Sequence, residues 1–318
     1  MHLSELRALY RKVDGGEIIR KIICERMISA ALLSMSANGT SRKGLEITRL
    51  TLELKTFLRI KKKYVYNLED LKRKVDEAYR SEWRARSKDV WVLWLQGRSS
   101  APEVVKKCIN SHEKCLKDRN VHILTEENYR ECVSFPPWIQ EKIDAGIITR
   151  THMSDLLRLE LLTKYGGTWI DATVFLSDRP ADYMLESQLF LFQTLKPGLD
   201  GHTTAISSWF MTSQADSRIL MLAREMLYEY WKNNNSLIDY FLIHYFIQIA
   251  IEQYPEEWGR VVPASNEPPH MLLLSEGRKD ARWIESVRAQ TPVHKLTYKC
   301  DEERLAELNE MIDWISRV

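Results

Sequence analysis

The sequence is poor in cysteine and has no long apolar run. Its five cysteines form no CxxC pair, and no histidine stands at a spacing typical of a structural zinc site. No apolar stretch reaches the roughly eighteen residues that a membrane span requires, and the first residues, MHLSELRALYRK, carry charge where a signal peptide is apolar. These absences predict a reduced, cytoplasmic chain that is neither integral to a membrane nor secreted by that route.

Net charge is also nearly absent, but the charges are unevenly distributed. The 46 basic and 44 acidic residues leave only +2, which argues against a dedicated nucleic-acid-binding protein. Through Lys88, 21 basic residues stand against 11 acidic ones, and the remainder has 25 against 33. Basic residues concentrate in segment 59–74. This segment is either a solvated helix surface or a contact with an anionic membrane, peripheral at the inner face of the plasma membrane.

Proline is missing from the first 85 residues, where apolar residues recur at helical spacing. One predicted helix runs from Ile18 to Leu32. Another runs from Leu45 to Leu58, with Ser41 or Asn38 near its start. Residues 1–87 are therefore expected to form a helical, basic N-terminal region.

Beyond residue 88 the pattern becomes that of an α/β sheet. The run Val90–Leu95 is apolar, β-branched and aromatic, as in a buried parallel strand. A helix from Ala101 to Cys115 and a second strand, Val121–Leu124, complete a βαβ unit. Ligands of such sheets bind at the carboxyl ends of the strands, where Gln96 and Gly97 follow the first strand.

Later segments extend the same fold. The predicted elements are strands at 168–170 and 189–192, an apolar stretch at 208–210, helices at 217–231, 238–253 and 302–315, and a proline-rich loop at 262–270. No internal repeat occurs, and neither GxGxxG nor GxxxxGK[ST] is found. A nucleotidyltransferase is therefore disfavoured.

The most informative block spans residues 154–173. Asp155 and Arg158 are three residues apart on a helix, so they share one face, and a Gly166-Gly167 turn leads to a strand that ends at Asp171. Two carboxylates and a guanidinium in one pocket suit a sugar bearing phosphate groups. The alternative is a surface ion pair beside an ordinary strand end.

The motifs SDLLR from Ser154 and YGGTWID from Tyr165 resemble the DXD-containing glycosyltransferases, a group with yeast mannosyltransferases and clostridial glucosylating toxins. With WLQG from Trp94, APEVVKKCINSH from Ala101 and VHKLTYK from Val293, the chain more closely resembles the capsular polysaccharide synthesis protein family. The resemblance covers about residues 88–300 and leaves the N-terminal region outside.

This resemblance implies a GT-A fold, a Rossmann-like α/β glycosyltransferase fold, over residues 88–318. Residues 88–200 would bind a nucleotide sugar and residues 201–318 would form the acceptor side. The family motifs imply a set of donor-binding residues: Trp94, Gln96, Gly97, Asp155, Arg158, Asp171, Thr173 and Lys295.

The resemblance also implies a divalent metal, Mn²⁺ or Mg²⁺, at the DXD position. Asp171 matches the first Asp, but Thr173 replaces the second, and a hydroxyl is a poor substitute for a carboxylate ligand. GT-A enzymes often add a histidine near the C-terminal end. His294 is the candidate here, with His270 a weaker one; alternatively, Lys295 and Lys299 clamp the diphosphate and reduce the need for metal.

The expected reaction moves a hexose from a nucleotide sugar, UDP-linked by expectation, onto a lipid-linked or oligosaccharide acceptor with retention, in surface polysaccharide synthesis. Asp155, Asp171 and Asp239 are the predicted catalytic residues. Trp209, Asp239 and His244 are the predicted acceptor-binding residues, although each also suits a packed core. The alternative function is a non-catalytic scaffold of a polysaccharide assembly complex, with a decayed DXD site.

Overall fold

The structure is a computed structural model that describes residues 27–79, 86–195, 203–275 and 280–317. Most of the helix predicted from Ile18 therefore lies outside the described residues. The helix expected from Leu45 is the middle of a much longer helix, α4 (Arg42–Ala78). Its N-terminus is capped by Ser41, whose side chain accepts a hydrogen bond from the Gly44 amide at 3.2 Å.

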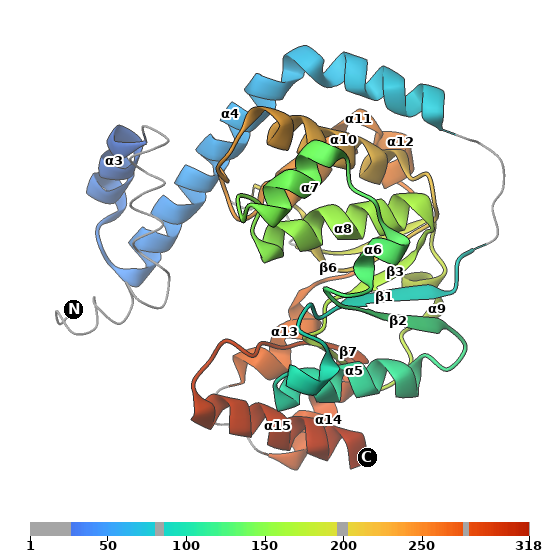
Figure 1. The fold of residues 1–318 in the computed structure, drawn as a ribbon. Helices are drawn as coiled ribbons and strands as arrows, with labels where there is room; N and C mark the ends of the chain where they lie inside the picture. The colour runs from blue at the N-terminus through green and yellow to red at the C-terminus, as the bar shows by residue number, and fades with distance from the viewer. Residues whose placement is uncertain (1–26, 80–85, 196–202, 276–279, 318) are drawn as a thin grey trace.

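A five-stranded sheet forms the centre of the molecule, in the order β2-β1-β3-β6-β5 (Figure 1). Strands β1, β2 and β3 are parallel, whereas β6 is antiparallel to both β3 and β5. A separate antiparallel pair joins β4 to β7. The strands are β1 (Asp89–Leu93), β2 (Asn120–Leu124), β3 (Gly167–Ile170), β4 (Val174–Leu176), β5 (Leu189–Gln193), β6 (Ile206–Ser213) and β7 (Val293–Lys295). The predicted α/β class and its Rossmann-like start are confirmed.

Helices cover both faces of this sheet (Figure 1). One face packs against α4, α6 (Tyr129–Cys132), α7 (Pro137–Asp144), α8 (Arg150–Lys164), α10 (Arg218–Asn233), α11 (Leu242–Gln253) and α12 (Pro255–Trp258). The other packs against α5 (Glu103–Cys115), α9 (Asp182–Leu185), α13 (Glu267–Leu274), α14 (Ala281–Gln290) and α15 (Glu302–Arg317). A 3-10 turn, Arg98–Ser100, follows β1. Each face of the sheet thus has its own apolar core.

The proline-rich segment 262–270 was expected to be a loop, and this expectation is wrong in its second half. Helix α13 begins at Glu267 and has Pro268 in its first turn. The first-turn amides of a helix have no partner within the helix, so a proline there removes no helical hydrogen bond.

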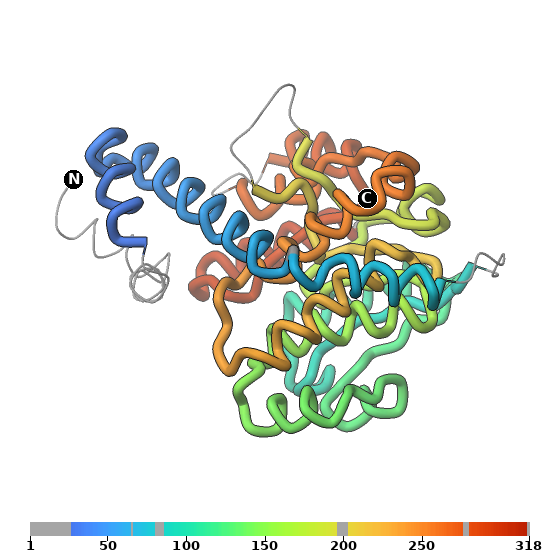
Figure 2. Tube along the Cα trace, turned by 90° about the horizontal axis from the view of Figure 1, so that it is seen from above, coloured from blue at the N-terminus to red at the C-terminus, as the bar shows by residue number. Residues whose placement is uncertain are grey.

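The long helix α4 belongs to two parts of the molecule. From Phe57 onward it contributes buried residues to the same core as β1, α8 and α10, including Phe57, Ile60 and Val75. Its first half packs against α3 (Ile28–Asn38) in a small separate cluster, and this helical pair projects away from the body (Figure 2). The later part of α4 therefore shares a core with the residues after 88, and the predicted domain boundary at residue 87 stays a prediction.

Much of the basic charge in segment 59–74 is paired within the protein. Lys61 lies 2.5 Å from Glu252, Lys74 lies 2.5 Å from Glu225, and Lys72 lies 2.6 Å from Asp76. Within the described ranges, no helix is long and apolar enough to cross a membrane. Contact of segment 59–74 with a membrane surface stays a prediction, as does the cytoplasmic location.

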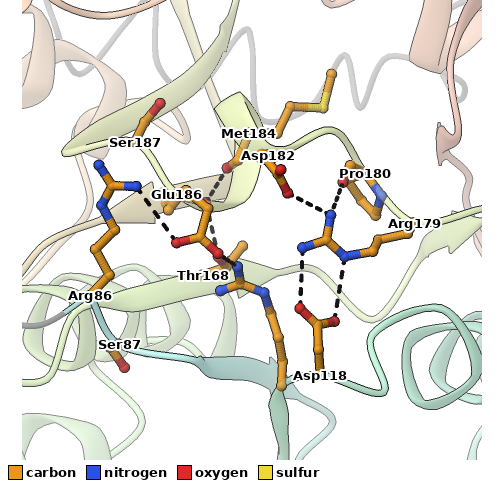
Figure 3. Close-up of polar contacts among 12 residues, drawn as sticks. Arg86, Ser87, Asp118, Thr168, Arg179, Pro180, Asp182, Met184, Glu186 and Ser187 are labelled. Carbon is orange, nitrogen blue, oxygen red and sulfur yellow. Dashed lines mark hydrogen bonds and ion pairs between the residues drawn. The ribbon is translucent and has the colours of Figure 1, made fainter.

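A charged cluster links the start of β2 to the segment around α9 (Figure 3). The Arg119 side chain is fully buried, and its guanidinium forms an ion pair with Glu186, which is 31% exposed. Arg86 lies 3.8 Å from the other oxygen of Glu186. Nearby, Arg179 contacts Asp118 at 3.1 Å and Asp182 at 2.7 Å.

Replacing Glu186 with glutamine is expected to lower the free energy of unfolding by about 2 to 3 kcal/mol, because the buried Arg119 charge would lose its anionic partner. Urea denaturation measures this loss. Asp182→Asn is the matched control: Asp182 is 75% exposed, and its pair with Arg179 is worth less than about 1 kcal/mol. Equal losses in the two variants would contradict the prediction.

Candidate active site

Side chains from α8 and the end of β3 converge at the carboxyl edge of the sheet. The Arg158 Nη2 atom lies 3.4 Å from Asp155 Oδ1 and 3.5 Å from Asp171 Oδ1. The turn after α8 is short, so the end of β3 lies close to the helix. Gly166, at φ 70°, ends the helix, and the strand begins at the next residue. The structure thus brings together the three residues that the sequence placed in one pocket.

Arg158 is held rigidly. Its Nη1 donates to both the carbonyl and the hydroxyl of Ser208 at 2.7 Å, and its guanidinium lies 4.9 Å from the centre of the Trp169 ring. Only 7% of the side chain is exposed. Arg158 is therefore well placed to fix the two carboxylates, and its direct contact with a donor sugar stays a prediction.

Asp171 accepts hydrogen bonds on both of its oxygens. Lys295 Nζ donates to Oδ2 at 2.8 Å, and the Trp169 indole donates to Oδ1 at 2.9 Å. Burial acts to raise the pKa of Asp171, but the positive charges of Lys295 and Arg158 outweigh it, so that the pKa lies below its ordinary value. Asp171 is thus ionised at neutral pH, and 27% of its side chain is exposed.

Lys295 reaches the site from the C-terminal part of the chain through the β4–β7 pair, in which it stands opposite Val174. Its ammonium also donates to Thr173 Oγ1 at 2.8 Å. Lys295 therefore bridges Asp171 and Thr173, the two positions that the sequence resemblance matches to a DXD motif.

The predicted metal ligand His294 lies elsewhere. As the neighbour of Lys295 on a strand, it points to the opposite side, where its Nε2 is 3.0 Å from Ser177 Oγ and its ring stacks on Phe175. No group of three or more His, Cys, Asp or Glu side chains suited to a metal occurs among the described residues. With Lys295 already on Asp171, the residues present here do not fit a divalent metal.

Sequence reasoning assigned no role to two further residues near these charged side chains. His152 Nδ1 lies 3.3 Å from Asp155 Oδ2, and the Tyr240 ring lies 6.1 Å from the His152 ring. Burial, together with the charges of Asp155 and Asp171, raises the pKa of Tyr240, although 59% of this residue is exposed. The signal for His152 was its position, three residues before Asp155 on the same helix.

The predicted acceptor residues are less exposed than Tyr240. Asp239 is buried and accepts the Phe241 amide at 2.7 Å, so it orders the turn before α11. Trp209 is 7% exposed and stacks on Phe192 with ring centres 4.6 Å apart. The described residues offer no hydrogen-bond partner to the buried Nδ1 atom of His244. The acceptor roles of all three stay predictions.

The end of β1 lies at the same edge as Asp171, because β1 pairs in parallel with β3 at Val90–Thr168. The Trp94 ring is 5.2 Å from the Tyr298 ring, and its buried Nε1 has no hydrogen-bond partner among the described residues. Gln96 is exposed, and Gly97 adopts φ 78°. This arrangement leaves a buried donor atom and an exposed amide at the same edge of the sheet as Asp171.

Three buried histidines predict acid sensitivity. Burial lowers the pKa of His112, His244 and His294 to about 4 in each case. Between about pH 6.5 and 4 the unfolded chain therefore binds more protons than the folded chain. The free energy of unfolding is highest above pH 6.5 and decreases as the pH falls to 4. Urea midpoints at pH 7, 5.5 and 4.5 measure this decline, and an unchanged midpoint would contradict it. His112→Gln should flatten it.

Comparison with known proteins gives three findings. The family model described as capsular polysaccharide synthesis protein matches residues 49–315. The O-glycosyltransferase braB of Annulohypoxylon truncatum is 34% identical over 98 residues, which make up 28% of this chain and 23% of that protein. The chain thus spans less than a quarter of this relative. The solved PaToxG glycosyltransferase aligns with a TM-score of 0.38 and 12% identity, covering 82% of this chain and 96% of that chain.

Three observations agree with the predicted class of enzyme, a glycosyltransferase: a cluster of charged side chains at the carboxyl edge of an α/β sheet, the family match and the name of the relative. The family match covers most of the chain. The chain therefore belongs to the capsular polysaccharide synthesis protein family. The match begins at residue 49, so the expectation that the N-terminal region lies outside the resemblance is wrong for most of α4.

Proposed function

We propose that this chain transfers a hexose from a nucleotide sugar to a glycan or lipid-linked acceptor in surface polysaccharide synthesis. The observation that carries the proposal is the convergence of Asp155, Arg158, Asp171 and Lys295 at the carboxyl edge of the sheet. That edge is where open α/β sheets bind their ligands. Separate charges of both signs in one pocket match a ligand that has both hydroxyls and phosphates.

The negative and positive side chains bind different parts of the donor. The carboxylates of Asp155 and Asp171 accept hydrogen bonds from sugar hydroxyls, and Lys295 faces the phosphates. The buried indole Nε1 of Trp94 and the exposed Gln96 are placed to meet the nucleotide. The donor is proposed to be a UDP-sugar.

The proposed reaction retains the configuration at the sugar. The acceptor hydroxyl oxygen forms a bond to the anomeric carbon on the same face from which the bond to the diphosphate oxygen breaks. The departing diphosphate takes the acceptor's proton. No strong base is needed on the protein, whose contribution is to position the reactants and to stabilise charge on the leaving group.

The acceptor is proposed to enter beside Tyr240. This side chain is exposed and lies next to His152. Burial and the negative charges of Asp155 and Asp171 raise its pKa. An exposed aromatic ring offers a sugar an apolar face and a phenolic hydroxyl. Asp239 would hold the turn that carries Tyr240, and His244 would pack against Phe241 in that turn. Trp209 packs in the core on the other face of the sheet, against Phe192.

A screen of UDP-, GDP- and CMP-sugars tests the proposal, with donor binding followed by calorimetry and donor hydrolysis followed by nucleotide release. We expect one nucleotide class to bind and to be hydrolysed slowly, and Asp155→Ala to abolish the hydrolysis. Asp182→Ala is the matched control on an exposed carboxylate. A folded chain that neither binds nor hydrolyses any donor would favour the alternative, a non-catalytic scaffold.

The proposed lipid-linked acceptor also makes a membrane contact testable. Lys62 and Lys63 are exposed on α4, whereas their neighbour Lys61 is paired with Glu252. The double variant Lys62→Gln/Lys63→Gln is expected to weaken binding to anionic liposomes, measured by sedimentation, by about 2 kcal/mol, near 1 kcal/mol for each lost charge. Lys114→Gln on α5 is the control. Equal binding of all three proteins would mean that this surface is only solvated.

A further inference from the structure

The DXD-like motif of this chain already holds a cation of its own. The Lys295 ammonium lies 2.8 Å from Asp171 Oδ2 and 2.8 Å from Thr173 Oγ1. These two atoms belong to the first and third positions of the Asp171-Ala172-Thr173 sequence. The ammonium thus occupies the place between them.

The remaining contacts at Asp171 act against a second cation. Its other oxygen accepts the Trp169 indole at 2.9 Å and lies 3.5 Å from Arg158 Nη2. A divalent ion on Asp171 would have to approach two positive side chains or displace Lys295. It would also find a hydroxyl where a carboxylate is usual, and Mg²⁺ and Mn²⁺ favour carboxylate and water oxygens.

Lys295 has the charge and the donors to act in place of a metal. An ammonium carries three N–H groups, and the described residues account for two of them, on Asp171 and Thr173. The side chain is 18% exposed, so the third can reach a phosphate oxygen in the pocket. Lysine binds phosphate as a compact point charge.

We propose that Lys295 is the built-in counter-cation of the diphosphate leaving group, and that donor binding and transfer do not depend on a divalent metal. This inference rests on the proposed function. As the bond from the anomeric carbon to the diphosphate oxygen breaks, the negative charge that develops on that oxygen is stabilised by the ammonium. Asp171 and Thr173 hold the ammonium in position.

Calorimetry of UDP binding to the full chain tests the inference, with EDTA in one series and Mn²⁺ in the other. Affinity is expected to differ by less than about twofold between the series. Lys295→Ala should weaken UDP binding by about tenfold or more in both, the loss typical of one charged hydrogen bond. Lys295→Arg should recover part of it. Lys114→Ala, an exposed lysine on α5, is the control and should bind UDP as the unaltered chain does.

A double variant, Lys295→Ala/Thr173→Asp, restores the second carboxylate and removes the ammonium. It is expected to bind UDP only when Mn²⁺ is present. Binding that is equal without Mn²⁺ would overturn the role of Lys295.

The unaltered chain provides a second test, which needs no variant. UDP binding that disappears in EDTA and returns with Mn²⁺ would overturn the inference while leaving the proposed function intact. No binding of UDP, GDP or CMP-sugars in either series would instead overturn the proposed function itself.

Discussion

Replacing Asp171 with asparagine is expected to lower kcat/KM for sugar transfer by about 10² to 10³. The substitution keeps the size of the side chain but removes the negative charge that holds Lys295 at 2.8 Å and faces Arg158 at 3.5 Å. A preorganised charge that is lost from an active site typically costs this much in rate. The measurement is initial transfer velocity with the donor identified by the screen, alongside thermal unfolding.

The variant should stay folded, because Arg158 keeps its contact with Asp155 at 3.4 Å, although the lost pairing of Lys295 lowers its stability. Trp169 can still donate to an asparagine oxygen, and the backbone bond from the Asp171 amide to the Trp209 carbonyl, at 2.9 Å, is unchanged. Asp182→Asn provides the control, since its carboxylate is 75% exposed and outside the pocket. Full activity of folded Asp171→Asn would remove Asp171 from the mechanism.

The parts of the fold that the sequence predicted are those with a local pattern. The apolar run of β1, the following helix α5 and the Gly166-Gly167 turn each depend on neighbours within about a dozen residues. The convergence of Asp155, Arg158 and Asp171 follows from helical spacing and one short turn. No distant contact had to be known for these predictions.

The contacts of Lys295 and His294 depend on pairing between distant segments. Strands β4 and β7 have only three residues each, too few for alternation to be read from sequence, yet their register decides which residue faces Asp171. A shift of one residue would have presented His294 in place of Lys295. The prediction of His294 as a metal ligand and the alternative of Lys295 on the diphosphate thus differed by a shift of one residue in the pairing of β4 with β7.

The exposure of Tyr240 could not be predicted for a different reason. The segment from Ile238 to Phe246 reads as one amphipathic helix, but the helix starts only at Leu242, after a turn held by Asp239. The spacing of apolar residues does not predict a turn that is stabilised by a hydrogen bond to a buried side chain, here Asp239. Tyr240, in that turn, is therefore exposed instead of packed in a helix.

Gly167→Ala is expected to destabilise the chain by about 2 to 5 kcal/mol. Gly167 adopts φ 93°, which costs other residues about 1 to 2 kcal/mol, and an added Cβ would lie 2.2 Å from the Asp89 carbonyl oxygen on the adjoining strand. Because that oxygen is backbone, β3 would have to move away from β1, at a typical overpacking cost of about 1 to 3 kcal/mol. Urea denaturation measures the loss.

Gly97→Ala separates the two contributions. Gly97 has a similar φ of 78°, but an added Cβ would meet no atom within 4 Å, so only the backbone cost of about 1 to 2 kcal/mol should appear. If both variants lose the same stability, the close approach of β3 to β1 is not a significant constraint. A larger loss for Gly167→Ala would mean that this glycine sets the spacing of the two strands, and through it the position of Asp171 relative to Trp94.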